Sequence, residues 1–146
     1  MLAFTLIRLC PWKVEVNIII VDDDRGNRNA LKAHLSRYGH QVRTADRGQK
    51  ALEKIDRADK EGTPLDLLVT DLKMPGMDGL ELLRSVNTRW PQMAKVLMTA
   101  YGGHRVRESA LHLCAEYIEK PFSPELLLKK MDQFQKVRGG QYVEKT

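Results

Sequence analysis

The 146-residue chain contains only two cysteines and no apolar run long enough to cross a bilayer. Cys10 and Cys114 cannot form a disulfide framework, and no spacing of Cys and His is typical of a zinc site, so we expect a reducing, cytoplasmic environment. The opening stretch MLAFTLIRLC has nine residues before Cys10 and carries Arg8, whereas a transmembrane helix needs about 20 apolar residues. It also lacks the basic start and the cleavage site of a signal peptide. We interpret residues 1–15 as an N-terminal extension; an anchor on a membrane surface is the disfavoured alternative.

Segments rich in glycine, proline or glutamine are also missing, as are internal repeats. A hydrophobic share of 42% with 29% charged residues is ordinary for a globular protein, and the length suits one domain. We expect this domain to span residues 16–138 and to be followed by a short tail, residues 139–146. Whether the chain stands alone or is part of a longer protein is left open by the sequence.

Acidic residues are scarce in one part of the chain. Between residues 25 and 60 there are ten Lys or Arg and only four Asp or Glu, which accounts for the net charge of +5. Aromatic residues do not alternate with these charges, apart from Tyr38. We therefore interpret the excess as a solvated helix face and expect no direct contact with nucleic acid, although a DNA or RNA binder is an alternative.

Five short apolar segments bounded by turn residues predict strands, and apolar residues at helical spacing predict a helix after each of them. The predicted strands are residues 16–21, 41–45, 65–70, 94–99 and 116–119. The helical positions are Leu31, Leu35 and Tyr38; Ala51, Leu52 and Ile55; Leu80, Leu83 and Val86; Val106, Ala110 and Leu113; and Leu127, Met131 and Phe134. This alternation predicts an α/β fold, a doubly wound parallel sheet with helices on both faces.

In such sheets a ligand binds beyond the carboxyl ends of the strands, so the residues at those ends are the candidates for a site. They are Asp22, Asp23 and Asp24 after the first strand, Asp71 after the third, Thr99 after the fourth and Lys120 after the fifth. Clustered carboxylates repel one another unless they hold a cation, and oxygen ligands with open positions suit Mg²⁺. A carboxylate can also attack phosphorus, while an amine and a hydroxyl can stabilise the oxygens of a phosphoryl group.

Each of these residues has a simpler explanation when taken alone. An aspartate after a strand is usually a turn or cap residue, and we interpret Asp24 and Asp78 as helix caps. Thr99 alone would be a strand residue, and Lys120 alone an exposed amine. Their joint order along the sheet favours a phosphoryl-transfer site.

Four segments carry a family resemblance. The segments IIIVDDD, VTDLKMPGMDGLELL, LMTAYG and YIEKPF resemble the signature segments of the receiver domain of two-component response regulators, over about residues 16–137. The chain is similar to the chemotaxis response regulator and to the receivers of NtrC-type regulators. The resemblance implies a flavodoxin-like fold with strand order 2-1-3-4-5. It also implies a phosphoacceptor signalling domain that catalyses only its own phosphorylation and dephosphorylation.

The resemblance assigns roles to individual residues. Asp71 would be the phosphoacceptor, Asp22 and Asp23 the acidic pocket, Thr99 and Lys120 the contacts to the phosphoryl group, and Tyr117 the switch residue that moves together with Thr99. Mg²⁺ or Mn²⁺ would be held by Asp23, Asp71 and the backbone carbonyl of Lys73, with Asp22 acting through a water. Met74, Pro75, Gly76 and Gly79 would shape the corner after Asp71, and a cis bond before Pro121 would aim Lys120 into the site.

Three positions depart from the family pattern or tune it. Cys114 stands where many relatives have the glycine that ends the fourth helix. Lys73 and Tyr101 occupy positions that adjust hydrolysis in the family, and we expect Tyr101 to shield the acyl phosphate from water.

The implied partners are proteins. A sensor histidine kinase or a histidine phosphotransfer protein would supply the phosphoryl group, and a small acyl phosphate is another possible source. The fourth helix, fifth strand and fifth helix would form the surface that binds an effector or a second copy of the chain.

A phosphatase of the haloacid-dehalogenase type is the strongest rival. It also uses an aspartate, a threonine, a lysine and Mg²⁺, but its nucleophile follows the first strand in a D-x-D-x-T/V context. The segment DDDRG lacks the Thr or Val, and Asp71 would have no role in such an enzyme.

Overall fold

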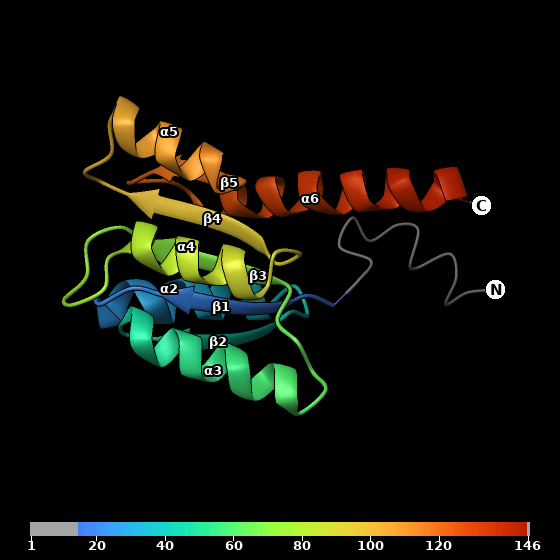
Figure 1. Cartoon of the computed structure of the whole chain (residues 1–146), viewed down its shortest axis with the longest axis horizontal. Coiled ribbons are helices and arrows are strands. Elements are labelled where there is room, and N and C mark those ends of the chain that lie inside the picture. The colour runs from blue at the N-terminus through green and yellow to red at the C-terminus, as the bar shows by residue number, and fades with distance from the viewer. Residues whose placement is uncertain (1–14, 146) are drawn as a thin grey trace.

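The computed structural model describes the backbone of residues 15–145 and forms three layers (Figure 1). The strands are β1 (Asn17–Val21), β2 (Gln41–Ala45), β3 (Leu67–Asp71), β4 (Ala94–Thr99) and β5 (Ala115–Glu119). The helices are α2 (Arg25–Ser36), α3 (Gly48–Lys60), α4 (Gly79–Arg89), α5 (His104–His112) and α6 (Pro124–Lys145). All five strands are parallel, in the order β2-β1-β3-β4-β5. The predicted alternation and the predicted strand order are confirmed.

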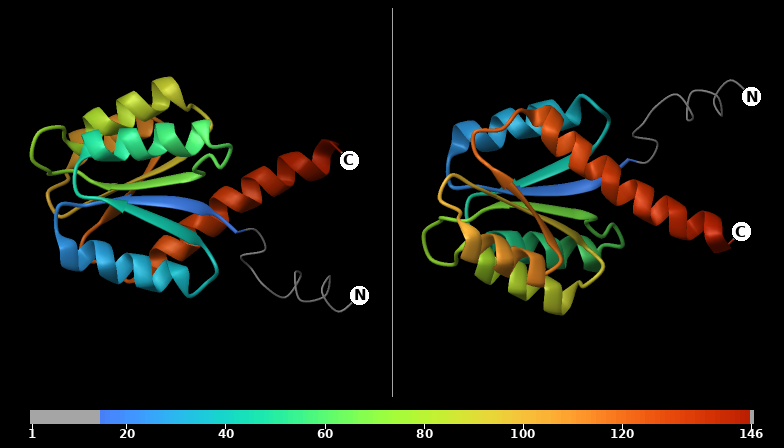
Figure 2. Two further views of the ribbon diagram at one scale, coloured as in Figure 1. Left: turned by 90° about the horizontal axis from the view of Figure 1, so that it is seen from below. Right: turned by 90° about the horizontal axis from the view of Figure 1, so that it is seen from above.

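Helices cover both faces of the sheet, as Figure 2 shows. On one face α3, α4 and α5 bury a cluster that includes Ile19 and Leu68, and on the other α2 and α6 bury a cluster that includes Ile20 and Val69. Alternate residues of one strand therefore enter different clusters, which is the consequence of the two-residue period of a strand. Burying each of these aliphatic side chains contributes about 1.5–3 kcal/mol to stability.

The strand register determines where the site residues lie. Val21 pairs with Thr70, Asp71 pairs with Met98, and Thr99 pairs with Glu119. The carboxyl ends of β1, β3, β4 and β5 therefore lie at the same level of the sheet, and the residues that end or follow these strands meet at one edge. We call this edge, with Asp22, Asp23, Asp71, Thr99 and Lys120, the carboxyl edge.

Both aspartates that we interpreted as caps begin helices. The Asp24 carboxylate accepts a hydrogen bond from the backbone N of Gly26 at 3.0 Å, at the start of α2. The Asp78 carboxylate accepts one from the backbone N of Glu81 at 2.9 Å, at the start of α4. These bonds satisfy amide groups that have no partner within the helix, and the prediction of two caps is confirmed.

The predicted helix positions hold except at two helix ends. α2 ends at Ser36, so Tyr38 lies beyond the helix and is 43% exposed, against the prediction. The turn that follows includes Gly39 with φ of +87°, a conformation that cannot continue a helix. Leu113 is the residue after the last turn of α5, although it still packs on the core.

Some expectations concern residues at the chain ends. Residues 1–14, with Cys10, lie outside the described residues, so the predicted N-terminal extension stays a prediction. α6 continues to Lys145 through the predicted tail, and the boundary at residue 138 is a prediction too. Within the described part of the chain, no helix combines the length and the apolar character that a membrane crossing requires.

Candidate functional site

Three carboxylates converge at the carboxyl edge. Asp22 follows β1 and is completely buried, Asp23 beside it is exposed, and Asp71 is the last residue of β3. One carboxylate oxygen from each of the three lies within 4.8 Å of the others. Charges of one sign at this separation repel strongly in a partly buried site, so the cluster needs a positive partner.

Lys120 supplies part of that positive charge. Its Nζ lies 2.9 Å from Asp22 Oδ2 and 3.3 Å from Asp71 Oδ2. The Lys120–Pro121 peptide bond is cis, as the resemblance implied. The other oxygen of each of these two carboxylates accepts a hydrogen bond from the backbone: Asp22 Oδ1 from the N of Asp24 at 2.9 Å, and Asp71 Oδ1 from the N of Leu72 at 2.8 Å.

The pKa values of Asp71 and Lys120 reflect this arrangement. Burial raises the pKa of Asp71 above its ordinary value; the charge of Lys120 opposes the rise, and the negative charge of Asp22 adds to it. Burial alone would lower the pKa of Lys120, but its hydrogen bonds to Asp22 and Asp71 and their charges raise it overall. The raised pKa of Asp71 indicates that the Lys120 ammonium does not fully offset the cost of burying the Asp71 charge.

Thr99 reaches the same edge from β4. It is 1% exposed, and its hydroxyl oxygen accepts a hydrogen bond from the backbone N of Tyr101 at 2.9 Å. The backbone carbonyl of Thr99 accepts from the N of Lys120 at 3.0 Å. Thr99 and Lys120 also line one open pocket of about 490 Å³ between the β4–α5 loop and the end of β5. The predicted hydroxyl and amine are thus brought to one side of the site.

Glycines shape the corner that follows Asp71. A Cβ atom at Gly79 would lie 2.2 Å from the backbone carbonyl oxygen of Asp71, a distance that no side chain could take. Gly79 also donates its N–H to the carbonyl of Leu72 at 2.7 Å. Gly76 has φ of +78°, which favours glycine for a backbone reason instead. The start of α4 is therefore packed directly on the main chain that carries Asp71.

Two residues meet at the mouth of the site. The Lys73 ammonium lies 4.3 Å from the centroid of the Tyr101 ring, a cation–π contact between the β3–α4 and β4–α5 loops. Tyr101 is 66% exposed. The ring is therefore held by Lys73 alongside the site rather than buried in it.

Tyr117 lies near the middle of β5, with its hydroxyl directed to the β4–α5 loop. The backbone N of Gly103 donates a hydrogen bond to the Tyr117 hydroxyl at 3.3 Å. The Arg107 guanidinium on α5 lies 5.9 Å from the centroid of the Tyr117 ring. The predicted switch residue thus contacts α5.

Sequence reasoning missed one contact to the acidic pocket from α2. Arg28 Nη1 donates a hydrogen bond to the backbone carbonyl oxygen of Asp22 at 2.7 Å. Its spacing, six residues after Asp22 in the first turns of a helix that starts at the site, is the signal that could have indicated it. Part of the basic excess is thus bound within the domain, and Arg47, Lys50 and Lys60 are likewise paired with Asp46 or Asp56.

The fold and this cluster of side chains define a class of signalling domain, and comparison with known proteins agrees. The model of the response regulator receiver domain matches residues 18–132. The chain therefore belongs to the receiver domain family of two-component response regulators.

Individual relatives support this assignment. The chain is 38% identical to the response regulator protein FleR of Pseudomonas aeruginosa over 112 residues, which are 76% of this chain and 23% of FleR. It is 34% identical to the chemotaxis protein CheY1 of Helicobacter pylori over 122 residues, 80% of this chain and 94% of CheY1. A CheY-like receiver domain from Methanospirillum hungatei has a TM-score of 0.78 at 30% identity and covers 88% of this chain and 99% of its own. Against the mycobacterial response regulator MprA the chain spans about half of the relative, 49%.

Proposed function

We propose that this receiver domain is a switch controlled by phosphorylation of Asp71. The observation that carries the proposal is the pairing of Lys120 Nζ with both Asp22 and Asp71, in a pocket where three carboxylates converge. A carboxylate that lies beside an ammonium and a hydroxyl has the groups that a phosphoryl acceptor requires.

The donor set fits a divalent cation. Carboxylate oxygens within 4.8 Å of one another are hard ligands, and Mg²⁺ or Mn²⁺ binds through one or two carboxylates with water at the other positions. Asp23, Asp71 and the backbone carbonyl of Lys73 would hold the ion, with Asp22 acting through a water. When bound, the ion supplies positive charge that reduces the repulsion between the Asp71 carboxylate and an incoming phosphoryl group.

The side chains of the domain would carry out the transfer. A carboxylate oxygen of Asp71 attacks phosphorus in line, so that the P–O bond forms as the P–N bond to the donor histidine breaks. Lys120 would then exchange its contact with Asp71 Oδ2 for one with a phosphoryl oxygen. The Thr99 hydroxyl would donate a hydrogen bond to a second phosphoryl oxygen.

The donor and the output are protein partners. A sensor histidine kinase or a histidine phosphotransfer protein supplies the phosphoryl group, and a small acyl phosphate can replace it in vitro. Movement of Thr99 and Tyr117 would change the surface of α5, β5 and α6, which corresponds to the fourth helix, fifth strand and fifth helix of the sequence analysis. That surface would bind an effector or a second copy of the chain. The domain that does so would span residues 16–138.

The rival nucleophile is Asp22, as a phosphatase of the haloacid-dehalogenase type would require. Both oxygens of Asp22 are hydrogen-bonded, and so are both oxygens of Asp71, so exposure separates the two candidates. The Asp22 side chain is 1% exposed and that of Asp71 is 14% exposed. A nucleophile must be reached by its substrate, which favours Asp71.

Incubation with Mg²⁺ and acetyl phosphate, followed by intact-protein mass measurement, tests the proposal. We expect the mass of one phosphoryl group on the wild type and none on Asp71→Asn. Asp24→Asn is the matched control, because it changes an aspartate at the same edge and keeps a good helix cap, and it should be labelled like the wild type. Equal labelling of Asp71→Asn and the wild type, or steady release of phosphate from simple esters, would contradict the proposal.

A further inference from the structure

The Tyr117 hydroxyl occupies space that only a glycine at position 102 leaves open. A Cβ atom at Gly102 would lie 1.3 Å from the Tyr117 hydroxyl oxygen and 2.6 Å from Cζ of the same ring. Real Cβ atoms do not come closer than about 3 Å to other heavy atoms, since dispersion contacts are optimal near 3.5–4.0 Å. Any side chain at position 102 would therefore displace Tyr117 from this position, which we call the Gly102 seat.

The backbone gives no separate reason for glycine at position 102. Gly39, Gly62, Gly76 and Gly103 have φ between +78° and +123°, whereas Gly102 does not adopt positive φ. At Gly103, with φ of +123°, a Cβ atom would meet nothing within 4 Å. The two adjacent glycines thus have different roles: Gly103 permits the backbone turn, and Gly102 makes room for Tyr117.

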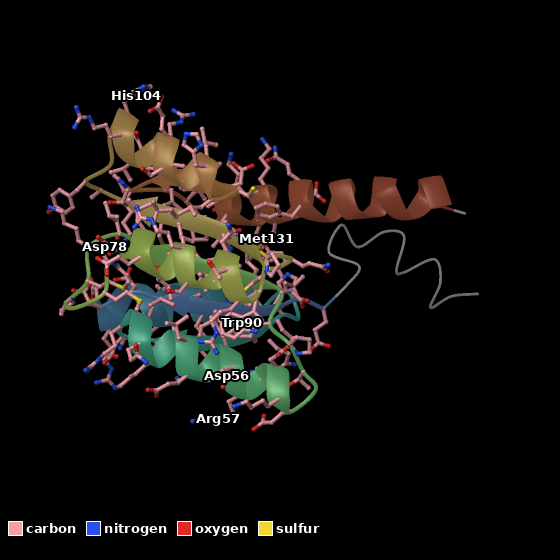
Figure 3. The ribbon with its side chains drawn as sticks, viewed as in Figure 1. Asp56, Arg57, Asp78, Trp90, His104 and Met131 are labelled. Atoms are coloured by element: carbon pink, nitrogen blue, oxygen red, sulfur yellow. The ribbon has the colours of Figure 1, made fainter. Side chains whose placement is uncertain are left out.

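The Gly102 seat connects β5 to the start of α5. The N–H of Gly103, the residue before α5, donates to the Tyr117 hydroxyl, and no side chain caps this helix. Arg107 in the second turn of α5 lies over the Tyr117 ring. Figure 3 shows His104, the first residue of α5, at the end of the helix nearest the carboxyl edge. If Tyr117 left the seat, both contacts with α5 would be lost.

The Gly102 seat is found in an arrangement in which Lys120 pairs directly with the Asp71 carboxylate. Lys120 contacts the Asp71 carboxylate itself at 3.3 Å, a contact that a phosphoryl group on Asp71 would replace. The Thr99 hydroxyl oxygen accepts from the N of Tyr101, which holds the β4–α5 loop close to the end of β4. The Gly102 seat therefore occurs together with the Lys120–Asp71 contact, and we call the arrangement that has both the resting state.

We propose that Gly102 is a positioning residue of the switch. Because it has no side chain, it leaves room for the Tyr117 hydroxyl and so stabilises the resting state. The inference rests on the proposed function, since it concerns the equilibrium that phosphorylation shifts. A ligand shifts a two-state equilibrium only by its difference in affinity for the two states, so a variant that destabilises the resting state should bind an activating ligand more tightly. Couplings of this kind usually change affinity by about 5- to 150-fold.

The test compares Gly102→Ala with the wild type in two measurements. In fluorotyrosine-labelled protein without any phosphodonor, ¹⁹F resonances report the surroundings of each tyrosine, and that of Tyr117 is assigned by its loss in Tyr117→Phe. In the second measurement, the concentration of beryllofluoride that half-saturates the protein is determined at fixed Mg²⁺. We expect Gly102→Ala to shift the Tyr117 resonance and to lower the half-saturating concentration about fivefold or more.

A double-mutant cycle separates the seat from a general effect on the loop. In a Tyr117→Ala background the side chain that occupies the seat is gone, so adding Gly102→Ala should change beryllofluoride binding by less than about twofold. Gly26→Ala is the matched glycine control, because its Cβ atom would meet only Asp24 Oδ1 at an ordinary 3.4 Å and its φ is not positive. It should leave the Tyr117 resonance unchanged.

Several results would overturn the proposal. They are an unshifted Tyr117 resonance in Gly102→Ala, unchanged or weaker beryllofluoride binding, and the same fold-change in both backgrounds of the cycle. If circular dichroism shows that Gly102→Ala does not fold, Tyr117→Phe is tested in its place. Loss of the hydroxyl should shift the Gly103 amide resonance and tighten beryllofluoride binding. No change in either measurement would reject the proposal. If Asp71 takes up no phosphoryl group, the proposed function fails, while the ¹⁹F comparison still decides whether Gly102 positions Tyr117.

Discussion

The two ends of the sheet each hold a lysine, half-buried at one end and buried at the other, and the two lysines differ in what surrounds them. Lys120 at the carboxyl edge lies between two carboxylates, which raise its pKa despite burial. Lys95 is the second residue of β4, at the opposite end, and is 1% exposed. Burial lowers the pKa of Lys95, nearby Cys114 opposes this weakly, and its Nζ donates to the carbonyl of Met93 at 3.1 Å.

The difference lies in whether a phosphoryl group could replace a partner of the lysine. Lys120 has anionic partners, so a phosphoryl oxygen can replace a carboxylate oxygen in its contacts without leaving the ammonium alone. The described contacts of Lys95 offer a neutral carbonyl, which binds an ammonium but cannot balance its charge. α4 connects the two ends: its capping residue Asp78 lies at the carboxyl edge, and Trp90, on which Arg89 stacks at 4.3 Å, lies at the other (Figure 3).

Replacing each lysine by methionine should therefore affect phosphoryl labelling differently, with a large effect at Lys120 and none at Lys95. Lys120→Met removes the ammonium from the phosphoryl site, and we expect the rate of labelling by acetyl phosphate to fall about 10²-fold or more, the usual cost of removing one stabilising donor. Lys95→Met should be labelled at the wild-type rate. Time courses of intact mass measure both, and equal rates in the two variants would contradict the assigned difference.

The stability of Lys95→Met gives the second comparison. Methionine fills a similar volume without a buried charge, so we expect the free energy of unfolding at pH 7 to rise by about 1–3 kcal/mol, or at least not to fall. Because the pKa of Lys95 is lower in the folded than in the unfolded state, the unfolded state binds more protons between the two values. Wild-type stability should then gain as pH rises through the folded pKa toward 10.5, and the advantage of the variant should shrink.

Urea unfolding at neutral and at alkaline pH measures this effect. A variant that is less stable than the wild type at pH 7 would show that the ammonium of Lys95 contributes more than the cost of its burial.

Cys114 offers a smaller test at the same end of the sheet as Lys95. It follows α5 with φ of +58°, in the left-handed region where a side chain costs about 1–2 kcal/mol and glycine costs nothing. We expect Cys114→Gly to raise the free energy of unfolding by about 1 kcal/mol, less the larger entropy that glycine gives the unfolded chain. Cys114→Ala, which keeps the strained backbone, is the control and should not show this gain.

The smallest expected effect concerns the Tyr101 ring beside the site. Tyr101→Ala should speed hydrolysis of phosphorylated Asp71 a few-fold, since the ring, held by Lys73 at 4.3 Å, limits the approach of water. Tyr101→Phe keeps a ring and should hydrolyse like the wild type. Decay of the phosphorylated mass after removal of acetyl phosphate measures both rates, and decay of Tyr101→Ala at the wild-type rate would reject the shielding role.

Much of the fold could be predicted because buried parallel strands are nearly continuous apolar runs. The predicted strand over residues 41–45 and that over 94–99 coincide with β2 and β4. The predictions for β1 and β5 differ by one residue at the start, and that for β3 starts two residues and ends one residue too early. The convergence of Asp22, Asp71 and Lys120 followed from the rule that parallel strands end at one edge. Their chemical roles stay predictions.

Other features depend on contacts that no local pattern encodes. Tyr38 satisfied the helical spacing, but the turn at Gly39 ended the helix before it. Lys95 lies in the predicted strand over residues 94–99, where no local pattern marks a lysine as buried, and its exposure of 1% results from the tertiary packing. Gly79 was assigned to the corner, but its contact with the Asp71 carbonyl required the folded main chain, as did the seat at Gly102.

The central claim is that Asp71 is the residue that takes the phosphoryl group. Its most direct test is borohydride reduction of the protein after incubation with Mg²⁺ and acetyl phosphate, followed by mass mapping of the peptides, because reduction converts an acyl phosphate of aspartate to homoserine. The account predicts homoserine at position 71 alone, dependent on Mg²⁺. Homoserine at position 22 or 23, or at no position while the protein still carries phosphate, would contradict it.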